Sequence, residues 1–203
     1  MDPQPITLTG QAVRLEPLSL AHAPALLAAL QPDLRIWQWL PIEPPLTLTA
    51  MEAYIADALA VQGTGTQIAF AQIALTTGRA VGGTRYLNIS RHDRGLEIGW
   101  TWLGRAWQRT AINTEAKYLL LSHAFDTLGA ARVQLKTDLR NEQSQRAIER
   151  LGAVREGVLR KYQKVRDGFI RDTVMYSIIA AEWPEVRARL ETFIAAQGGT
   201  VAI

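Results

Sequence analysis

A helix that passes directly into a strand limits the fold of this chain more than any other feature. Apolar residues recur at helical spacing over 113–128, Gly129 ends that pattern, and an alternating segment follows at once over 132–137. A further helix and two strands come next, at 142–151, 154–164 and 173–179. Strand, helix, strand, helix and strand in succession predict a sheet covered by helices.

The chain before this region predicts a different arrangement. Expected elements are a strand at 13–18, a helix at 19–30, a proline-rich loop at 31–46, a helix at 49–61, and a meander of strands at 68–75, 80–89 and 96–103. We therefore predict an α/β (α+β) fold with a mixed sheet, formed as one domain over 1–203. A last helix is expected at 182–196, and the tail Gln197–Gly199 is expected to fray.

The amino-acid composition excludes several kinds of functional site. The chain has no cysteine, which excludes disulfides, thiolate metal sites and a cysteine nucleophile. It also lacks His/Asp/Glu groups at metal-ligand spacing, so no metal is expected. The net charge of +3 is spread along the chain without a Lys/Arg run, so it favours a phosphate-bearing small ligand at least as much as nucleic acid. No membrane segment or signal-peptide pattern is found, and a cytoplasmic protein is the expectation.

The turn over 108–114 joins a predicted strand to the start of a helix. Backbone N–H groups in a first helical turn lack partners within the helix, and the helix dipole places positive charge there. Such a turn can bind a pyrophosphate, and Arg105 and Arg109 beside it add charge. An ordinary strand–helix connection is the structural alternative, since the turn contains no glycine.

Several motifs, in order along the chain, resemble the GNAT superfamily of N-acetyltransferases. The run WQRTAINTEAK at 107–117 resembles the family's acyl-CoA loop and helix, and LGAARV at 128–133 and NEQSQRAIERLGA at 141–153 resemble the segments that follow. Six further segments resemble the RimJ/RimL-type branch of the family, which includes ribosomal-protein N-terminal acetyltransferases. They lie at 13–18, 37–41, 156–160, 167–168, 171–172 and 175–178. The match runs from about Leu8 to about Trp183.

The resemblance implies a GNAT-like fold in which two central parallel strands, 96–103 and 132–137, diverge and receive acetyl-CoA. Cofactor-binding positions carried over from the family are Thr101, Trp102, Leu103, Gln108, Arg109, Thr110, Ala111, Ile112, Asn113, Thr114, Asn141 and Ser144. The family usually has small, glycine-like residues where this chain has Ala111 and Asn113. Backbone amides can bind phosphate without glycine, provided that φ is negative through the turn.

Acetyl transfer to an amine requires a base and stabilisation of the developing oxyanion. Glu97 is the first candidate for the base, with a surface or ion-paired glutamate as the alternative, and His92 is a backup. Ser144 is a candidate acid for the leaving thiolate, with helix capping as its alternative reading. Many relatives have a tyrosine where this chain has Ile148. Weaker candidate acids are Tyr162 and Tyr176.

Trp37 and Trp39 lie in the proline-rich loop and are candidate substrate-binding residues together with Glu97. The alternative for the tryptophans is one core anchor and one lid residue. The leading hypothesis is an acetyl-CoA-dependent N-acetyltransferase in which a protein N-terminus or a small-molecule amine attacks directly. A silent acyl-CoA-binding module is the alternative, and an RNA-associated protein is a third. A homodimer is common in the resembled family.

Overall fold

The computed structural model describes residues 1–196 of the chain. Its strands are β1 (Leu8–Thr9), β2 (Val13–Pro17), β3 (Ile68–Ala74), β4 (Arg79–Ser90), β5 (Gly95–Leu103), β6 (Arg132–Asp138), β7 (Val154–Lys164) and β8 (Ile170–Ile179). Its α-helices are α1 (Ala23–Leu30), α2 (Leu48–Gly63), α3 (Ala111–Ser122), α4 (Glu142–Leu151) and α5 (Trp183–Ala196). The mixed α/β fold is confirmed, and the tail Gln197–Gly199 lies outside the described residues.

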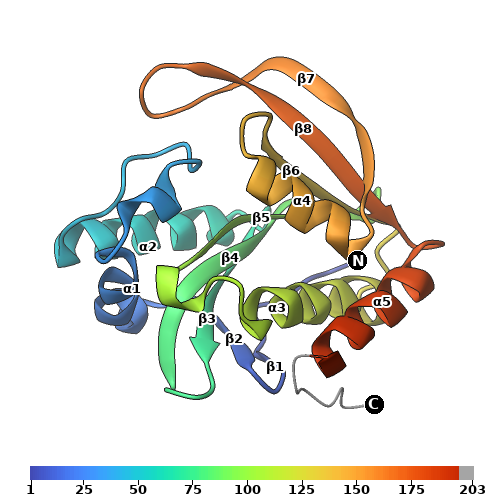
Figure 1. The fold of residues 1–203 in the computed structure, drawn as a ribbon, viewed down its shortest axis with the longest axis horizontal. Coiled ribbons are helices and arrows are strands. Elements are labelled where there is room, and N and C mark those ends of the chain that lie inside the picture. Colours follow the sequence, from blue (N-terminus) through green and yellow to red (C-terminus); the bar gives the residue numbers. More distant parts are fainter. Residues whose placement is uncertain (197–203) are drawn as a thin grey trace.

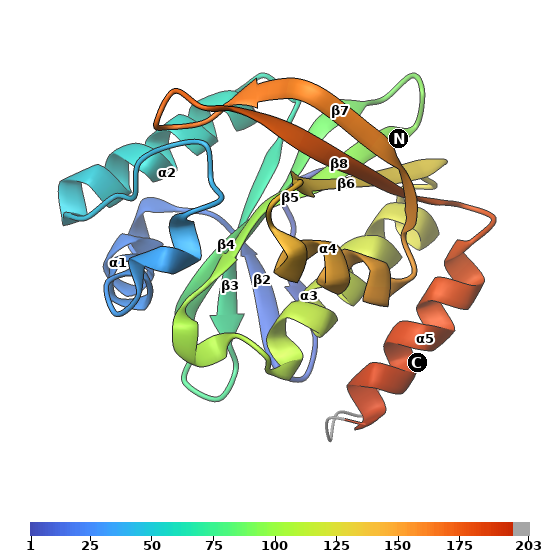
Figure 2. The same ribbon diagram turned by 45° about the horizontal axis from the view of Figure 1, so that its top comes forward.

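All eight strands belong to one sheet with the order β1-β2-β3-β4-β5-β6-β8-β7. Neighbouring strands in the described part are antiparallel, except that β5 and β6 are parallel. In Figure 1 the β7–β8 hairpin arches above α4, and Figure 2 shows it reaching across the molecule towards the loop before α2. The predicted mixed, mostly antiparallel sheet with a central parallel pair is confirmed.

The parallel pair separates part-way along its length. β5 and β6 are paired only from Gly95 with Arg132 to Glu97 with Gln134. Beyond this point β5 stays with β4 as far as Leu103, while β6 stays with β8. A gap therefore opens between two strands whose outer edges remain fixed in the sheet. The divergence predicted for this pair is present.

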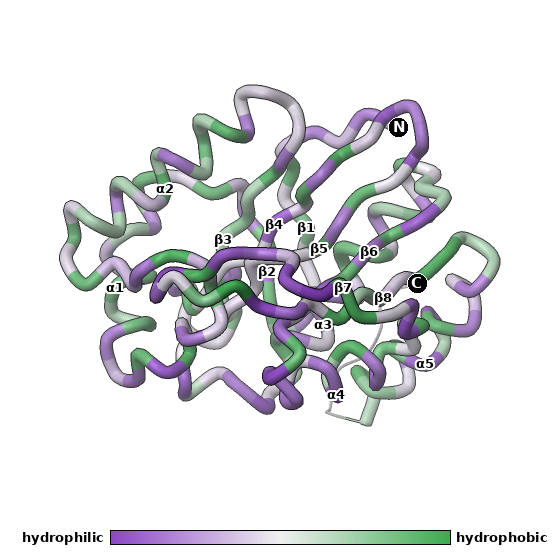
Figure 3. Tube along the Cα trace, turned by 90° about the horizontal axis from the view of Figure 1, so that it is seen from above, coloured by the Kyte–Doolittle hydropathy of each residue, from purple (hydrophilic) through white to green (hydrophobic). Residues whose placement is uncertain are grey.

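Alternating residues of β3 explain why helices cover both faces of the sheet. Phe70 packs in the core under α3, α4 and α5, whereas Ala69 and Ala71 pack in a second core under α1 and α2. Successive side chains of a strand point to opposite faces, so the buried β3 serves both cores. The β7–β8 hairpin is less buried than β3. Hydrophilic residues (purple) alternate with hydrophobic ones (green) along it in Figure 3, and most of β7 is exposed.

Local hydrogen bonding shifts several predicted boundaries. The helix expected from residue 113 begins at Ala111, because Thr110 caps it, and its end at His123–Thr127 is a π-helical turn. The helix expected over 19–30 is divided into a 3-10 turn and α1, with a proline in the first turn of α1. Strand β1 is too short to show an alternating pattern and was not predicted from the sequence.

Candidate active site

A cavity of about 860 Å³ lies where β5 and β6 separate. Its walls come from β5, β6, the starts of α3 and α4, the β7–β8 hairpin and the loop before α2. The cavity thus collects segments from almost the whole length of the chain. Twelve of the fifteen residues predicted for binding or catalysis line it: Trp39, Glu97, Thr101, Trp102, Leu103, Gln108, Arg109, Thr110, Asn113, Thr114, Asn141 and Ser144.

Three predicted residues, Trp37, Ala111 and Ile112, do not line the cavity. Trp37 is 0% exposed, and its ring packs edge-on against Tyr54 and Trp102, with centroids 5.3 and 5.2 Å away. The prediction of Trp37 as a substrate-binding residue is therefore corrected: it anchors the loop in the core. Ile112 is also a core residue, and its backbone N–H is donated to the Thr110 hydroxyl.

The turn before α3 is shaped by Thr110 and Arg109. The Thr110 hydroxyl donates to the Trp107 carbonyl at 2.8 Å and accepts the N–H of Ile112 at 3.4 Å. Arg109 has φ of 62°, in the left-handed region that non-glycine residues rarely adopt. The condition of negative φ through this turn is therefore not met at Arg109. The left-handed residue reverses the chain between Gln108 and Thr110, which are both extended.

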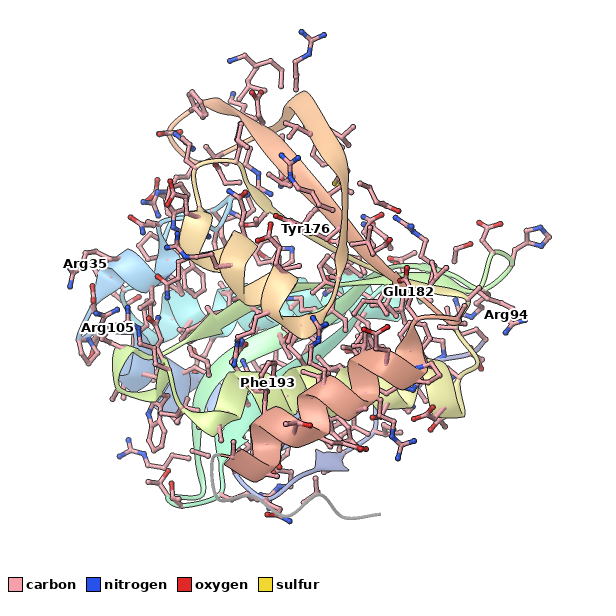
Figure 4. The ribbon with its side chains drawn as sticks, turned by 45° about the vertical axis from the view of Figure 1, so that its right-hand side comes forward. Arg35, Arg94, Arg105, Tyr176, Glu182 and Phe193 are labelled. Atoms are coloured by element: carbon pink, nitrogen blue, oxygen red, sulfur yellow. The ribbon has the colours of Figure 1, made fainter. Side chains whose placement is uncertain are left out.

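Four arginines line the cavity around this turn: Arg105, Arg109, Arg146 and Arg150. Arg150 Nη2 donates to the Thr114 hydroxyl at 2.9 Å, which fixes its guanidinium against the first turn of α3. Arg105 Nη1 donates to Gln108 Oε1 at 3.2 Å, and Figure 4 shows Arg105 beside Arg35 at one end of the molecule. Arg109, Arg150 and the helix N-terminus make this end of the cavity positively charged, whereas Arg105 lies 3.9 Å from Asp33 and Arg146 is paired with Glu142 at 3.1 Å.

Glu97 stands where the parallel pairing ends, and its side chain is 2% exposed. Its Oε2 accepts hydrogen bonds from Asn88 Nδ2 at 2.9 Å and Gln134 Nε2 at 3.2 Å, and lies 3.0 Å from Lys136 Nζ. Among the described residues no donor contacts Oε1. A Cβ at position 99 would lie 2.9 Å from that oxygen, so Gly99 leaves it space. The carboxylate is held by one oxygen and left available at the other.

Lys136 and Arg171 are among the cations of the cavity wall that the sequence analysis did not predict. In the sequence, Lys136 is distinguished only by its alternation with apolar residues on β6. Arg171 belongs to the short segment 171–172 that resembles the RimJ/RimL-type branch. Arg171 is 6% exposed, and it donates from Nε to the Thr173 hydroxyl at 3.2 Å and from Nη1 to the Trp39 carbonyl at 3.3 Å. Burial lowers the pKa of this guanidinium.

A buried lysine, also missed from the sequence, lies on the cavity wall. Lys117 is 6% exposed, and its Nζ donates to the Thr101 hydroxyl at 2.7 Å, which in turn lies 2.8 Å from the Thr84 hydroxyl. Lys117 makes no ion pair within the described residues. Burial therefore lowers its pKa from 10.5 to about 7. The sequence signal for this site was a lysine on the mostly apolar, buried face of α3.

Ser144 and Asn141 meet at the start of α4. Asn141 Oδ1 accepts the backbone N–H of Ser144 at 3.0 Å, so Asn141 caps this helix. The Ser144 hydroxyl is half-buried on the cavity wall and makes no hydrogen bond to another described residue. Ile148, one turn further along α4, also lines the cavity. The capping role therefore belongs to Asn141, and the serine hydroxyl remains available to a ligand.

The family is decided by a match over most of the chain. Residues 12–154 match the model of the acetyltransferase (GNAT) domain. The chain belongs to the GNAT acetyltransferase family. This confirms the family inferred from the ordered motifs, and the cavity at the diverging strands is thus part of a GNAT domain.

Individual relatives agree with this assignment. The domain is 33% identical over 96 residues to the "Putative ribosomal N-acetyltransferase YdaF" of Bacillus subtilis (strain 168), a match covering 47% of this chain and 51% of YdaF. The chain therefore spans about half the length of this curated relative. A crystal structure of a "putative acetyltransferase" from T. thermophilus is 42% identical, with a TM-score of 0.86 and coverage of 96% of this chain and 100% of the other.

Mycobacterium smegmatis RimJ in complex with CoA-disulfide has the same fold, with a TM-score of 0.83 at 23% identity and 98% coverage of both chains. The similarity to YdaF supports the RimJ/RimL-type branch.

Other predicted participants lie away from the cavity of the GNAT domain. His92 is exposed in the turn between β4 and β5 and does not line the cavity, so it is not a backup base. Tyr176 donates its hydroxyl to Glu149 Oε1 at 2.9 Å, and burial raises its pKa to about 12. Figure 4 shows it between β8 and α4, outside the cavity lining. Tyr162 also does not line the cavity; its ring lies 5.4 Å from Lys136 Nζ.

Residues 1–196 contain neither a metal-binding cluster nor a membrane-spanning helix. No group of three or more His, Asp or Glu side chains in this part of the GNAT domain could hold a metal ion. None of its helices is both long and apolar enough to cross a membrane.

Proposed function

We propose that this protein is an acetyl-CoA-dependent N-acetyltransferase, in which a primary amine attacks acetyl-CoA directly in a ternary complex. The observation that carries the proposal is the joining of three features in one cavity: diverging strands, a cationic helix N-terminus, and a fixed carboxylate at the point of divergence. The family membership of the chain supports the reaction class.

The residues of the cavity fit acetyl-CoA. Its phosphates require cations and N–H donors, which Arg109, Arg150 and the first turn of α3 offer on one wall. The pantetheine arm carries amide groups, and the edge of β5 after Glu97 has main-chain groups that β6 does not use. We propose that Thr101 to Leu103 hold this arm.

When bound, acetyl-CoA supplies an acetyl group activated as a thioester. The chain then has to deprotonate the attacking amine, and Glu97 Oε1 is placed to take that proton directly or through a water molecule. Lys136 and the two amide donors hold Glu97 in position. Because the chain has no cysteine, no thiol of the protein can carry the acetyl group.

Ser144 is the side chain proposed to return a proton to the leaving thiolate. Its hydroxyl lies on the cavity wall near the start of α4, and Ile148 there has no proton to give. The proposed acceptor is a protein N-terminus or a small-molecule amine, and Trp39 on the cavity wall is proposed to contact it. The name of YdaF supports a ribosomal acceptor. A single domain over 1–203, a cytoplasmic location and a homodimer complete the proposal.

A catalytically silent acyl-CoA-binding module is the second candidate. It is favoured by the departures from the family pattern at Ala111 and Asn113, and by Ile148 on the cavity wall where many relatives have a tyrosine. The two candidates share the cofactor and differ in turnover.

Calorimetric titration with acetyl-CoA and a thiol-release assay over a panel of amines and peptides test both candidates. Binding with release of CoA supports the transferase. Binding without release from any amine supports the silent module. Absence of binding at millimolar acetyl-CoA contradicts both.

A further inference from the structure

The cavity holds cations on two walls, and the proposed cofactor accounts for those on one. Arg105, Arg109, Arg146 and Arg150 surround the start of α3, where phosphates are expected. Lys136 and Arg171 come instead from β6 and β8. Lys136 is paired with Glu97 at 3.0 Å, which leaves Arg171 as the cation of the β6–β8 wall to be explained.

Arg171 is a buried guanidinium whose charge interacts with Asp138 and Glu97 at longer range. It forms no ion pair within the described residues, and its two hydrogen bonds go to a hydroxyl and a carbonyl, both uncharged. The nearby carboxylates are already engaged: both oxygens of Asp138 accept from Arg140, at 2.9 and 2.7 Å, and Glu97 is held by Lys136. A guanidinium has five N–H donors and matches a carboxylate with two parallel hydrogen bonds.

The surroundings of Arg171 are polar and have unmet hydrogen-bonding capacity. Gln163 faces Arg171 across the β7–β8 pairing and also lines the cavity. Its Oε1 is buried without a hydrogen-bond partner in the described part of the chain. Buried polar atoms are normally satisfied, so this part of the wall is built for a polar ligand.

Resting on the proposed function, we propose that Arg171 binds a carboxylate on the acceptor, so that the preferred substrates are amines that also carry a carboxylate. Glu97 faces the amino group and Arg171 the carboxylate, so the pair of opposite charges matches a ligand with both groups. The carboxylate has two sources: the α-carboxylate of a free amino acid, or an acidic side chain at the start of a peptide.

Matched acceptors test this inference with the full-length protein. One arm compares free amino acids with their carboxamides, and the other compares short peptides that begin with Asp or Glu with peptides that begin with Asn or Gln. We expect kcat/KM to favour the carboxylate in one arm by at least about tenfold, the effect of a hydrogen bond to a charged group in a buried site. The arm that shows the preference identifies the source.

Three variants assign the preference to Arg171. Arg171→Gln should reduce the preference to about one, and Arg171→Lys should keep part of it. Arg160→Gln is the matched control, since Arg160 is exposed on the same hairpin and does not line the cavity. Should Arg171→Gln fail to fold, the wild-type preference and Arg171→Lys still decide the question.

A wild-type protein that turns over neutral and carboxylate-bearing amines equally would overturn this inference and leave the proposed function intact. A preference that survives Arg171→Gln would also overturn it. Failure of the proposed function is a different result, namely acetyl-CoA binding without turnover of any amine in either arm.

Discussion

At the scale of single residues, the carboxylate of Glu97 is constrained without being blocked. Three donors converge on Oε2, and Gly99 leaves space at Oε1. A buried carboxylate needs such partners to offset the loss of its hydration. Glu97 can therefore form its ion pair with Lys136 through one oxygen and still accept a proton at the other.

Glu97→Gln should separate these two roles. The amide has nearly the same shape as the carboxylate but cannot accept the amine proton, so kcat should fall by about 100-fold or more. The Kd for acetyl-CoA, measured by calorimetry, should stay within about threefold of the wild-type value, because Glu97 lies outside the phosphate end of the cavity. Glu52→Gln, at an exposed position of α2, is the control. Unchanged turnover across the pH range would rule out Glu97 as the base.

Arg109 combines a charge with an unfavourable backbone conformation, and two substitutions separate these effects. Both Arg109→Ala and Arg109→Gly remove a phosphate-binding side chain and should weaken CoA binding about tenfold. Glycine adopts the left-handed conformation at φ 62° without strain, so Arg109→Gly should be more stable than Arg109→Ala by about 1 kcal/mol. Calorimetry and urea unfolding measure the two effects. Wild-type affinity in both variants would show that backbone amides alone hold the phosphates.

At the scale of elements, local patterns predicted the helices and strands, and longer-range packing set the details of the site. The period of apolar residues located α3 and β6, but the left-handed Arg109 that precedes α3 leaves no sequence signal. Where β5 and β6 separate is likewise not encoded in either strand alone, and only the family resemblance predicted it. Trp37 and Trp39 look alike in sequence, and contacts with α2 and β5 bury only Trp37.

Helix α3 also holds the N-terminal segment, through one carboxylate. Glu115 accepts the backbone N–H groups of Gln11, Ala12 and Val13 at 2.7, 2.7 and 2.9 Å, and it is 4% exposed. Glu115→Gln retains one acceptor oxygen and brings an N–H group against these donors. We expect it to lower the free energy of unfolding by about 2–4 kcal/mol.

Urea unfolding of Glu115→Gln beside Glu52→Gln, a change at an exposed position on α2, would measure this effect. Equal midpoints for the two variants would show that the N-terminal segment is held by other contacts. A large loss for Glu115→Gln alone would show that β1 and β2 depend on α3 for their position.

At the scale of the whole molecule, the sheet separates two hydrophobic cores, and the cavity opens where the sheet itself is interrupted. Polar and charged side chains can be buried there because main-chain pairing between β5 and β6 has ended. Lys117 is the extreme case, since it is placed beneath the divergent part of β5 with one hydroxyl for a partner. Its desolvation lowers the stability of the folded protein whenever the amine is charged.

Lys117 therefore predicts how global stability changes with pH. Below about pH 7 its amine is protonated in both the folded and the unfolded state, and between about 7 and 10.5 the folded state releases the proton first. The unfolded state then binds more protons, so stability rises with pH in this window. Relative to Lys117→Met, the wild-type free energy of unfolding should increase by about 2 kcal/mol from pH 7 to pH 9.

Urea unfolding at both pH values measures this difference for wild type, Lys117→Met and Lys164→Met, the last being an exposed lysine of β7. Because Lys164 is solvated in both states, its variant should follow the wild-type pH profile. Parallel profiles for wild type and Lys117→Met would mean that the buried amine keeps an ordinary pKa, for which it would need a counter-ion within the cavity. Stabilities of wild type and Lys117→Met that converge as the pH rises would instead show that the buried lysine loses its charge near neutral pH. The positive charge of the cavity would then come from Arg171 on one wall and from the arginines around α3 on the other.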